Sequence, residues 1–115
     1  MDTVYYLSTC DTCRKILASL PDNNLVLQDI KKDPITESEI DRMKELAGSY
    51  EALFSRKAQL YKSRGLKDRT LTEDDYRNLI LEHYTFLSRP VFIISDKIYV
   101  GNSAKNVANV IEALK

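Results

Sequence analysis

The two cysteines of the chain, Cys10 and Cys13, lie three positions apart within residues 7–20, LSTCDTCRKILASL. Thiols at this spacing have three ordinary uses: they hold a metal ion, close a small disulfide, or fill part of a core without reacting. A disulfide closed over so few residues is typically reducible, and it suits thiol–disulfide exchange better than permanent bracing. The residues around the pair decide among these uses.

A metal site is the first alternative. A structural zinc site ordinarily takes four protein ligands. The chain offers two cysteines and a single histidine, His83, far along the sequence. A site shared between two copies would need an oligomer, of which the sequence gives no indication. We therefore expect no metal, which leaves a redox-active pair or an inert one.

The composition is that of an ordinary soluble globular protein. Of 115 residues, 43% are hydrophobic and 30% are charged, and 17 basic residues balance 17 acidic ones. This length allows one core and is short for two ordinary domains, so we expect a single domain over residues 1–115. A nucleic-acid-binding surface normally needs a basic excess, so we expect no direct contact with nucleic acid.

The sequence gives no sign of export or of membrane insertion. No basic segment leads into an apolar run near the N-terminus. No apolar stretch approaches the roughly 20 residues that span a bilayer. We therefore expect a cytoplasmic protein with no membrane partner. Lasting structural disulfides are rare in that compartment, so working thiols are favoured over a permanent brace.

The cysteine pair falls where a predicted strand meets a predicted helix. Residues 4–7, VYYL, form a short apolar and aromatic run typical of a buried strand. An apolar stripe at helical spacing follows, formed by Cys13, Ile16, Leu17 and Leu20. Residues 25–27, LVL, predict a second strand after Pro21. Together these segments predict a β-α-β unit with a parallel strand pair.

The middle of the chain, residues 33–86, reads as a helical insertion. Thr36 and Glu39 form a capping box at one helix start, and Thr72 caps another. Between these helices, residues 55–69 carry six basic residues against one acidic residue. We expect a short helix or an irregular loop there.

The last third of the chain predicts a hairpin followed by a helix. Residues 91–94, VFII, are continuously apolar, as a strand buried on both faces would be. Residues 98–100, IYV, predict the returning strand after a turn at residues 95–97. A final helix carries an apolar face formed by Val107, Val110, Ile111 and Leu114. The whole order predicts an α/β fold, with a four-stranded mixed sheet (β-α-β … β-β-α) covered by helices.

This placement predicts different roles for the two cysteines. A helix N-terminus presents free backbone N–H groups and a partial positive charge, which stabilise a thiolate and lower the pKa of a cysteine there. Cys10 precedes the helix and can face solvent, so we assign it the attack. Cys13 lies on the apolar stripe and should point inward, so we assign it the resolving step.

Charged neighbours of the pair act in both directions. Arg14 and Lys15 place cations near Cys10, where they would stabilise a thiolate or attract an anionic substrate. Basic residues in a first turn oppose the helix dipole, however, and solvation alone would explain them. Asp11 would raise the pKa of the thiol unless its carboxylate is occupied in capping the helix.

A second pair of residues, Arg89 and Pro90, immediately precedes the predicted buried strand. Taken alone, it is a proline at strand entry preceded by a surface arginine. Taken with TCDTCRK near the N-terminus, LFSRKAQLYKSRGLKD in the middle and LSRPVFIISDKIYVG near the end, it resembles the arsenate reductase and Spx-like (ArsC) family of the thioredoxin superfamily. The resemblance covers essentially the whole chain. It implies a thioredoxin-like fold with Pro90 in the cis form beside Cys10.

One branch of this family implies an enzyme. In the glutaredoxin-coupled arsenate reductases, a cysteine attacks arsenate, arginines bind the oxyanion and glutathione supplies electrons. Cys10 matches the nucleophile and Arg89 matches the arginine before the proline. The middle-loop arginine falls at Ser55, with Arg56 displaced by one position, and the last arginine falls at Gly101. The resemblance thus implies a thiol reductase of arsenate or another small substrate, with Arg89 binding the anion and glutathione or glutaredoxin as electron donor. Arg14, beside Cys10, and Arg56, in the basic segment, are further anion-binding candidates by their positions.

The other branch implies a regulator. Spx-like proteins use a CxxC disulfide as a switch and bind RNA polymerase. This chain has the CxxC pair, and Gly48 lies near the position of the glycine that makes the polymerase contact. A glycine that ends a helix explains Gly48 as well. We favour the reductase, keep the redox-switched regulator as the alternative, and place a non-redox interaction module third.

Overall fold

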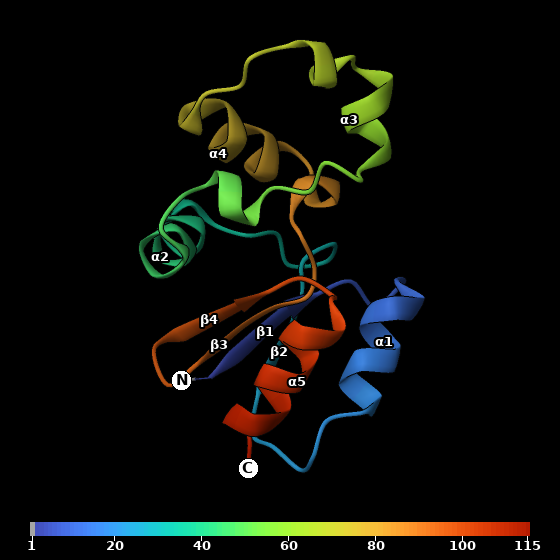
Figure 1. Ribbon diagram of the computed structural model, residues 1–115, viewed down its shortest axis with the longest axis vertical. Coiled ribbons are helices and arrows are strands. Elements are labelled where there is room, and N and C mark those ends of the chain that lie inside the picture. The colour runs from blue at the N-terminus through green and yellow to red at the C-terminus, as the bar shows by residue number, and fades with distance from the viewer. Residues whose placement is uncertain (1) are drawn as a thin grey trace. The chain divides into compact units, whose positions relative to one another are not determined.

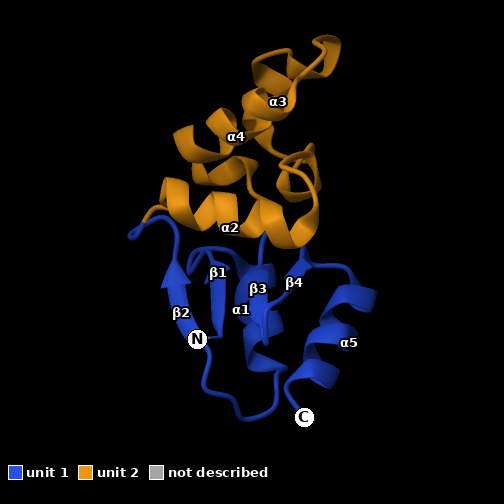
Figure 2. Cartoon of the chain, turned by 90° about the vertical axis from the view of Figure 1, so that its left-hand side faces the viewer, with its two compact units in different colours: residues 1–33, 89–115 blue, residues 34–88 orange. Residues whose placement is uncertain are grey.

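The computed structural model describes residues 2–115. The chain forms two compact units (Figure 2), which are described in turn. Unit 1 comprises Met1–Asp33 and Arg89–Lys115, and unit 2 is Pro34–Ser88. The predicted helical insertion, residues 33–86, therefore falls almost entirely in unit 2.

Unit 1 is built on a four-stranded mixed sheet (Figure 1). Its strands are β1 (Thr3–Tyr6), β2 (Val26–Asp29), β3 (Val91–Ile94) and β4 (Lys97–Val100). The strand order is β2-β1-β3-β4, with β2 parallel to β1 and both β1–β3 and β3–β4 antiparallel. This arrangement confirms the predicted α/β, thioredoxin-like fold class.

Two helices, α1 (Asp11–Ala18) and α5 (Ala104–Ala113), lie on the same side of the sheet (Figure 1). Between them and the sheet is a core cluster to which β1, β3 and both helices contribute. Its buried members are Val4, Ile16, Phe92, Ile94 and Val110. The predicted apolar stripes supply the helical part of this core. The helix α1 ends before Pro21, as predicted, but two residues short of Leu20, which still packs against the cluster.

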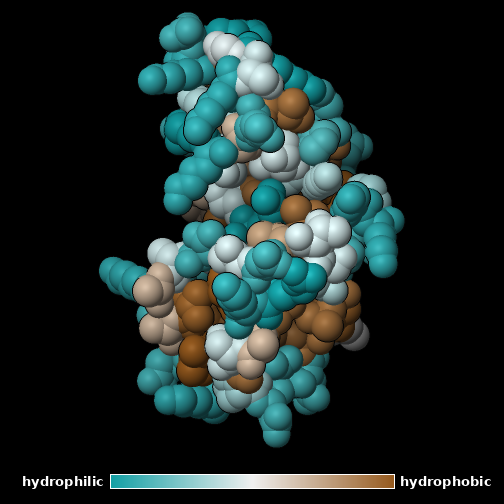
Figure 3. Space-filling model, turned by 90° about the vertical axis from the view of Figure 1, so that its right-hand side faces the viewer, coloured by the Kyte–Doolittle hydropathy of each residue, from teal (hydrophilic) through white to brown (hydrophobic). Residues whose placement is uncertain are grey.

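The edge strand β2 differs from its prediction. It begins at Val26 and runs to Asp29, rather than covering residues 25–27. Val26 and Leu27 are 42% and 58% exposed because an edge strand has a neighbour on one side only. Figure 3 shows that hydrophobic surface is also present in the lower half of one side of the molecule, beside hydrophilic surface. The apolar run in this segment therefore correctly predicted a strand, but the strand is not fully buried.

The β3–β4 hairpin turns more tightly than predicted. Ser95 and Asp96 both take positive φ, 50° and 63°, as the two central residues of a type I′ turn do. Lys97 therefore opens β4 and does not belong to the turn. All four residues of β3 are buried, as its continuously apolar sequence predicted.

Unit 2 is helical. It contains α2 (Glu37–Ala47), α3 (Gln59–Ser63) and α4 (Glu73–Glu82), with 3-10 turns at Glu51–Leu53, Leu66–Asp68 and Tyr84–Phe86. The capping box of Thr36 with Glu39 is confirmed, and Thr72 forms a second one with Asp75. Gly48 ends α2 at φ 97°, a left-handed conformation that favours glycine.

Aromatic rings and one arginine hold unit 2 together. Phe54 stacks on Phe86 with ring centroids 5.4 Å apart and contacts Tyr76 at 4.8 Å. Arg77 of α4 donates to Asp41 of α2 at 2.9 Å. His83 ends α4, and its Nδ1 accepts the N–H of Thr85, which gives it a structural role. Within residues 2–115, no helix has the length and apolar character needed to cross a bilayer.

Candidate active site

A tight turn places Cys10 at the start of α1. The carbonyl of Leu7, just after β1, accepts the N–H of Cys10 at 3.1 Å. Cys10 is the N-cap residue of α1 with extended backbone (φ −94°, ψ 114°), and its own carbonyl accepts the N–H of Arg14. Its sulfur therefore lies beside the free N–H groups of the first helical turn.

The two cysteines differ in exposure. Both are free thiols; Cys10 is partly exposed, whereas Cys13 is fully buried. Their side chains are close enough for a sulfur–sulfur hydrogen bond. The structure thus brings together the two cysteines that the sequence analysis assigned to attack and resolution. Cys10 is the more exposed of the two, as the sequence predicted.

The surroundings of Cys10 favour its thiolate. Burial opposes ionisation, but the N–H and thiol of Cys13, the charge of Arg89 and the N–H of Thr12 outweigh it, so the pKa of Cys10 lies below its ordinary value. The sulfur makes no capping hydrogen bond of normal geometry, so these N–H groups act on it mainly through their dipoles. Cys10 therefore carries more thiolate near neutral pH than a free cysteine.

The surroundings of Cys13 favour its thiol. Burial raises the pKa of Cys13 to about 11, and the hydrogen bond and charge of a Cys10 thiolate push in the same direction. The backbone N–H of Leu7 and the charge of Arg89 partly offset these effects. A thiol that stays protonated can donate to the neighbouring thiolate, so the reduced pair holds one proton between two sulfurs.

Arg89 and Pro90 complete the site from the far end of the chain. Their peptide bond is cis, the conformation that the family resemblance implied. Pro90 is buried, and its carbonyl accepts the N–H of Gly101 at 2.9 Å. The Nε atom of Arg89 is buried too, and the guanidinium charge stabilises both sulfurs as thiolates. Gly101 has φ 98°, and a Cβ placed there would meet no atom within 4 Å.

The other two predicted anion-binding arginines already have carboxylate partners. Arg14 pairs with Asp11 on the exposed side of α1. This contact also engages the Asp11 carboxylate that would otherwise disfavour a thiolate. Arg56 belongs to unit 2, where it binds Glu51 at 2.6 Å and the hydroxyl of Tyr76 at 3.0 Å. Each would have to share or exchange its partner to bind another anion.

A contact near the cysteines that the sequence analysis missed joins Ser8 to Asp29. The Ser8 hydroxyl donates to the Asp29 carboxylate at 2.5 Å, across 21 positions of sequence. No local motif marks either residue. The parallel pairing of β1 with β2, which sets Tyr6 opposite Asp29, is the signal that brings them together.

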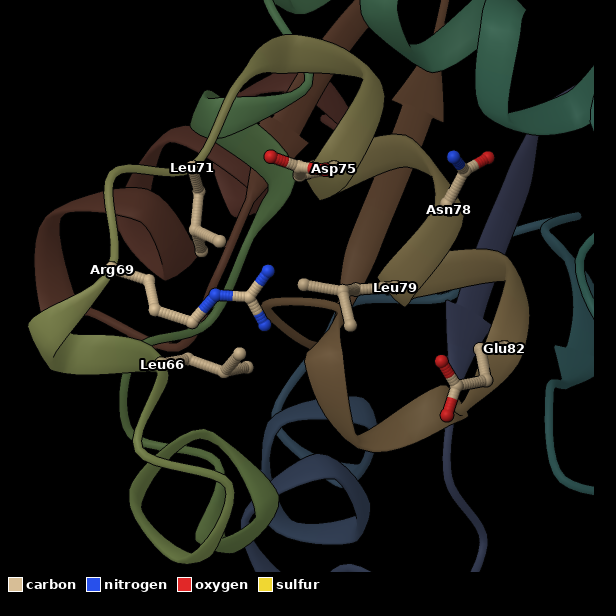
Figure 4. A pocket seen from close by; sticks show the side chains of 7 residues that line it. All are labelled: Leu66, Arg69, Leu71, Asp75, Asn78, Leu79 and Glu82. Carbon is tan, nitrogen blue, oxygen red and sulfur yellow. The ribbon is translucent and has the colours of Figure 1, made fainter.

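A shallow pocket lies elsewhere, in unit 2 (Figure 4). The side chain of Arg69 reaches into it, between Asp75 and Glu82 of α4. Its apolar lining comes from Leu66, Leu71 and Leu79. This pocket contains neither cysteine. Among residues 2–115, no three His, Cys, Asp or Glu side chains gather as metal ligands would.

Solved structures share this fold over nearly the whole chain. The YffB protein has a TM-score of 0.84 at 19% identity, and the alignment covers 100% of both chains. Arsenate reductase from Vibrio cholerae has a TM-score of 0.74 at 24% identity, covering 98% of this chain and 97% of that one. At such identities the likeness shows the fold alone, a thioredoxin-like mixed four-stranded sheet with helices.

Two further comparisons define the family. The family model described as "ArsC family" matches residues 5–110. A structure titled "possible arsenate reductase from Streptococcus mutans UA159" is 33% identical, with a TM-score of 0.69, over 85% of this chain and 87% of that one. The chain belongs to the ArsC family. No protein among the curated ones matches it.

Proposed function

We propose that this chain is a thiol–disulfide oxidoreductase in which Cys10 attacks and Cys13 resolves. One observation carries the proposal: the partly exposed Cys10 is the N-cap residue of α1 and the buried Cys13 lies one turn further, an arrangement that lowers the pKa of Cys10 and raises that of Cys13 to about 11. An inert core pair has no need of a partly exposed thiolate at a helix N-terminus. ArsC-family membership supports the same reading.

The first step is attack by the Cys10 thiolate. On an oxyanion such as arsenate, its sulfur forms a bond to arsenic, and one oxygen leaves as water after taking up protons. The charge of Arg89 lowers the pKa of both cysteines, and the same charge would hold the anion beside the nucleophile. Arsenic remains pentavalent in this adduct, so no electrons have yet been transferred.

The second step is resolution by Cys13. The charge of the Cys10 thiolate helps to raise the pKa of Cys13, and that charge disappears once the Cys10 sulfur is bound to substrate. Cys13 then ionises more readily, with Arg89 still favouring its thiolate. Its attack on the Cys10 sulfur forms the disulfide and releases arsenite. Two electrons pass from the dithiol to arsenic, so the step balances.

A small thiol or a thiol-redox protein restores the dithiol. Two glutathione molecules, or a glutaredoxin, would reduce the Cys10–Cys13 disulfide by two thiol–disulfide exchanges. The partial exposure of Cys10 supports this route, because an incoming thiolate needs access to one sulfur. Cys10 is therefore the sulfur that would form the mixed disulfide.

The substrate is arsenate or another small molecule. In the family's anion-binding pattern, Arg89 matches the arginine before the proline, and the position of the last arginine falls at Gly101. The middle position falls at Ser55, and the neighbouring Arg56 is paired with Glu51. This incomplete set favours a substrate that needs fewer guanidinium contacts than arsenate does. The natural substrate of the same cysteine chemistry would then be less highly charged.

The same incomplete set supports one alternative, a redox-switched regulator that binds RNA polymerase. A disulfide switch needs the cysteine pair but no oxyanion pocket. Turnover separates the two proposals. With glutathione and glutaredoxin, the reductase reduces arsenate or another small oxidant over many cycles, and Cys10→Ser abolishes this. A regulator shows one oxidation per chain and captures polymerase only in one redox state.

A further inference from the structure

The turn that carries Cys10 is fastened to the neighbouring strand by one side-chain bond. Ser8 lies between β1 and α1, and its Oγ donates to Oδ2 of Asp29, the last residue of β2, at 2.5 Å. The bond is partly buried. A hydroxyl that donates to an ionised carboxylate forms one of the stronger and shorter classes of hydrogen bond.

Asp29 is a firm anchor for such a bond. Its second carboxylate oxygen accepts the N–H of Lys31 at 3.2 Å. Its backbone carbonyl accepts the N–H groups of Lys32 and Asp33 at 3.1 and 2.8 Å. The ladder with β1 continues past it, because Ile30 donates to the carbonyl of Tyr6 at 2.9 Å. The carboxylate therefore has little freedom to follow a turn that moves.

Both sulfurs depend on the turn that Ser8 occupies. The carbonyl of Leu7 accepts the N–H of Cys10, which sets where the nucleophile enters α1. The N–H of Leu7 stabilises the Cys13 thiolate. A displacement of this turn would move Cys10 away from the N–H groups of Thr12 and Cys13. It would also change the support that Cys13 receives.

We propose that Asp29, acting through Ser8, is a positioning residue that holds the Leu7–Cys10 turn and so keeps the sulfur of Cys10 aligned with the N-terminus of α1. The inference rests on the proposed role of Cys10 as nucleophile. Neither Ser8 nor Asp29 touches the substrate or exchanges electrons. Their contribution is the geometry of the thiolate.

A positioning role and an electrostatic role of Asp29 predict opposite changes in the pKa of Cys10 when Asp29 is removed. A carboxylate near a thiol disfavours the thiolate, so an electrostatic role predicts that removing Asp29 lowers the pKa of Cys10. A positioning role predicts that removing it raises this pKa, because the sulfur loses its N–H neighbours. The direction of the change therefore separates the two explanations.

The test measures the alkylation rate of Cys10 against pH in full-length protein carrying Cys13→Ser, whose hydroxyl can still donate to Cys10. We expect Asp29→Ala and Ser8→Ala each to raise the pKa of Cys10 by about half a unit to one unit, a loss of roughly threefold to tenfold in rate at neutral pH. The double variant should lose no more than either single one, because both remove the same bond.

Two further variants serve as controls. Asp29→Asn should stay near the parent value, since its amide can donate to Ser8 while its oxygen accepts from Lys31. Asp33→Ala removes a carboxylate from the same turn and should change nothing, since the bonds of Asp33 in this turn are made by its backbone. Thermal melting of each variant shows that it is folded. Ser8→Ala, which deletes only a hydroxyl, gives the answer if Asp29→Ala does not fold.

The outcomes separate this inference from the proposed function. A lowered Cys10 pKa in the parent that neither Ser8→Ala nor Asp29→Ala raises would overturn the positioning role and leave the oxidoreductase intact. A fall in pKa on Asp29→Ala would also overturn it, in favour of charge. An ordinary Cys10 pKa in the unsubstituted chain would instead overturn the proposed function itself.

Discussion

The side chains of Cys10 and Cys13 interact at the start of α1, and the environment lowers the pKa of the first and raises that of the second. The cause of this asymmetry is the junction of β1 with α1. Cys10 caps the helix at the molecular surface, whereas Cys13, one turn further, points into the core. One proton is thus kept on the buried sulfur while the exposed sulfur is free to attack.

The charge of Arg89 predicts a measurable effect on the nucleophile. Arg89→Gln should raise the pKa of Cys10 by roughly half a unit to one unit, because a cation near the thiolate is lost. Alkylation rates measured against pH would show the shift. The matched control removes the Asp11–Arg14 ion pair as a whole, as Asp11→Asn with Arg14→Gln: it leaves no unpaired charge beside Cys10, so it should have a much smaller effect. An equal shift in both variants would contradict the role given to Arg89.

The cysteines should make stability depend on pH in two windows. The lowered pKa of Cys10 stabilises the fold above the unfolded value of about 8.5, and this contribution is lost as pH falls through the folded pKa. The raised pKa of Cys13 stabilises the fold below about pH 8.5, and this contribution is lost as pH rises toward about 11.

Urea unfolding of the reduced protein at pH 8 and pH 10 tests the second window. The free energy of unfolding should fall between these values by on the order of 1–2 kcal/mol more than in Cys13→Ser, which lacks the titrating thiol. Lysine and tyrosine titration is common to both proteins and cancels in the difference. Identical pH profiles would show that the Cys13 thiol is not held protonated by burial.

Gly101 offers a test of the substrate. Gly101→Ala should destabilise the fold by about 1–2 kcal/mol, because a residue with a Cβ is strained at φ 98°. Gly101→Arg has the same backbone cost, but its side chain has open space at Cβ and adds a guanidinium close to Pro90. We expect Gly101→Arg, and not Gly101→Ala, to raise kcat/KM for arsenate. No gain would indicate that this position does not limit arsenate binding.

The helix caps of unit 2 predict a loss of stability that is separate from the redox chemistry. Thr36→Ala and Thr72→Ala each remove the side-chain oxygen of a capping box, at a cost of about 1 kcal/mol. Chemical unfolding measures this cost, with Ser38→Ala as an exposed control on α2. The alkylation rate of Cys10 should not change in any of the three. A change would mean that the caps affect more than their helices.

Much of the fold could be predicted because local signals and tertiary packing agree. The stripe through Cys13 and Ile16 predicts an inward-facing helix side, and both residues are buried. The capping box at Thr36 marks the start of α2 to the residue. The boundaries and burial of β2 could not be predicted from such local signals. Whether Val26 and Leu27 are covered depends on the strand order, which no local pattern contains.

The parts of the site formed by residues close in sequence could be predicted. Contacts between residues far apart in the sequence could not. A CxxC after an apolar strand predicts a thiolate at a helix N-terminus. The bond from Ser8 to Asp29 exists only because β1 and β2 are parallel and in register. The pairing of Arg14 with Asp11 is an i,i+3 contact within one helix, which the spacing alone could have predicted. The pairing of Arg56 with Glu51 follows no such spacing, so the sequence pattern could not predict it.

The pKa of Cys10 is the most direct test of the account. Iodoacetamide alkylation of the reduced chain is followed across pH 4–10 by intact mass, with Cys13→Ser to isolate the exposed sulfur. We expect Cys10 to react first, with a midpoint clearly below the value of about 8.5 for an unperturbed cysteine. Mild oxidation of the unsubstituted chain should remove two hydrogens and block the reaction. A midpoint at or above the ordinary value, with no such mass change, would contradict the account.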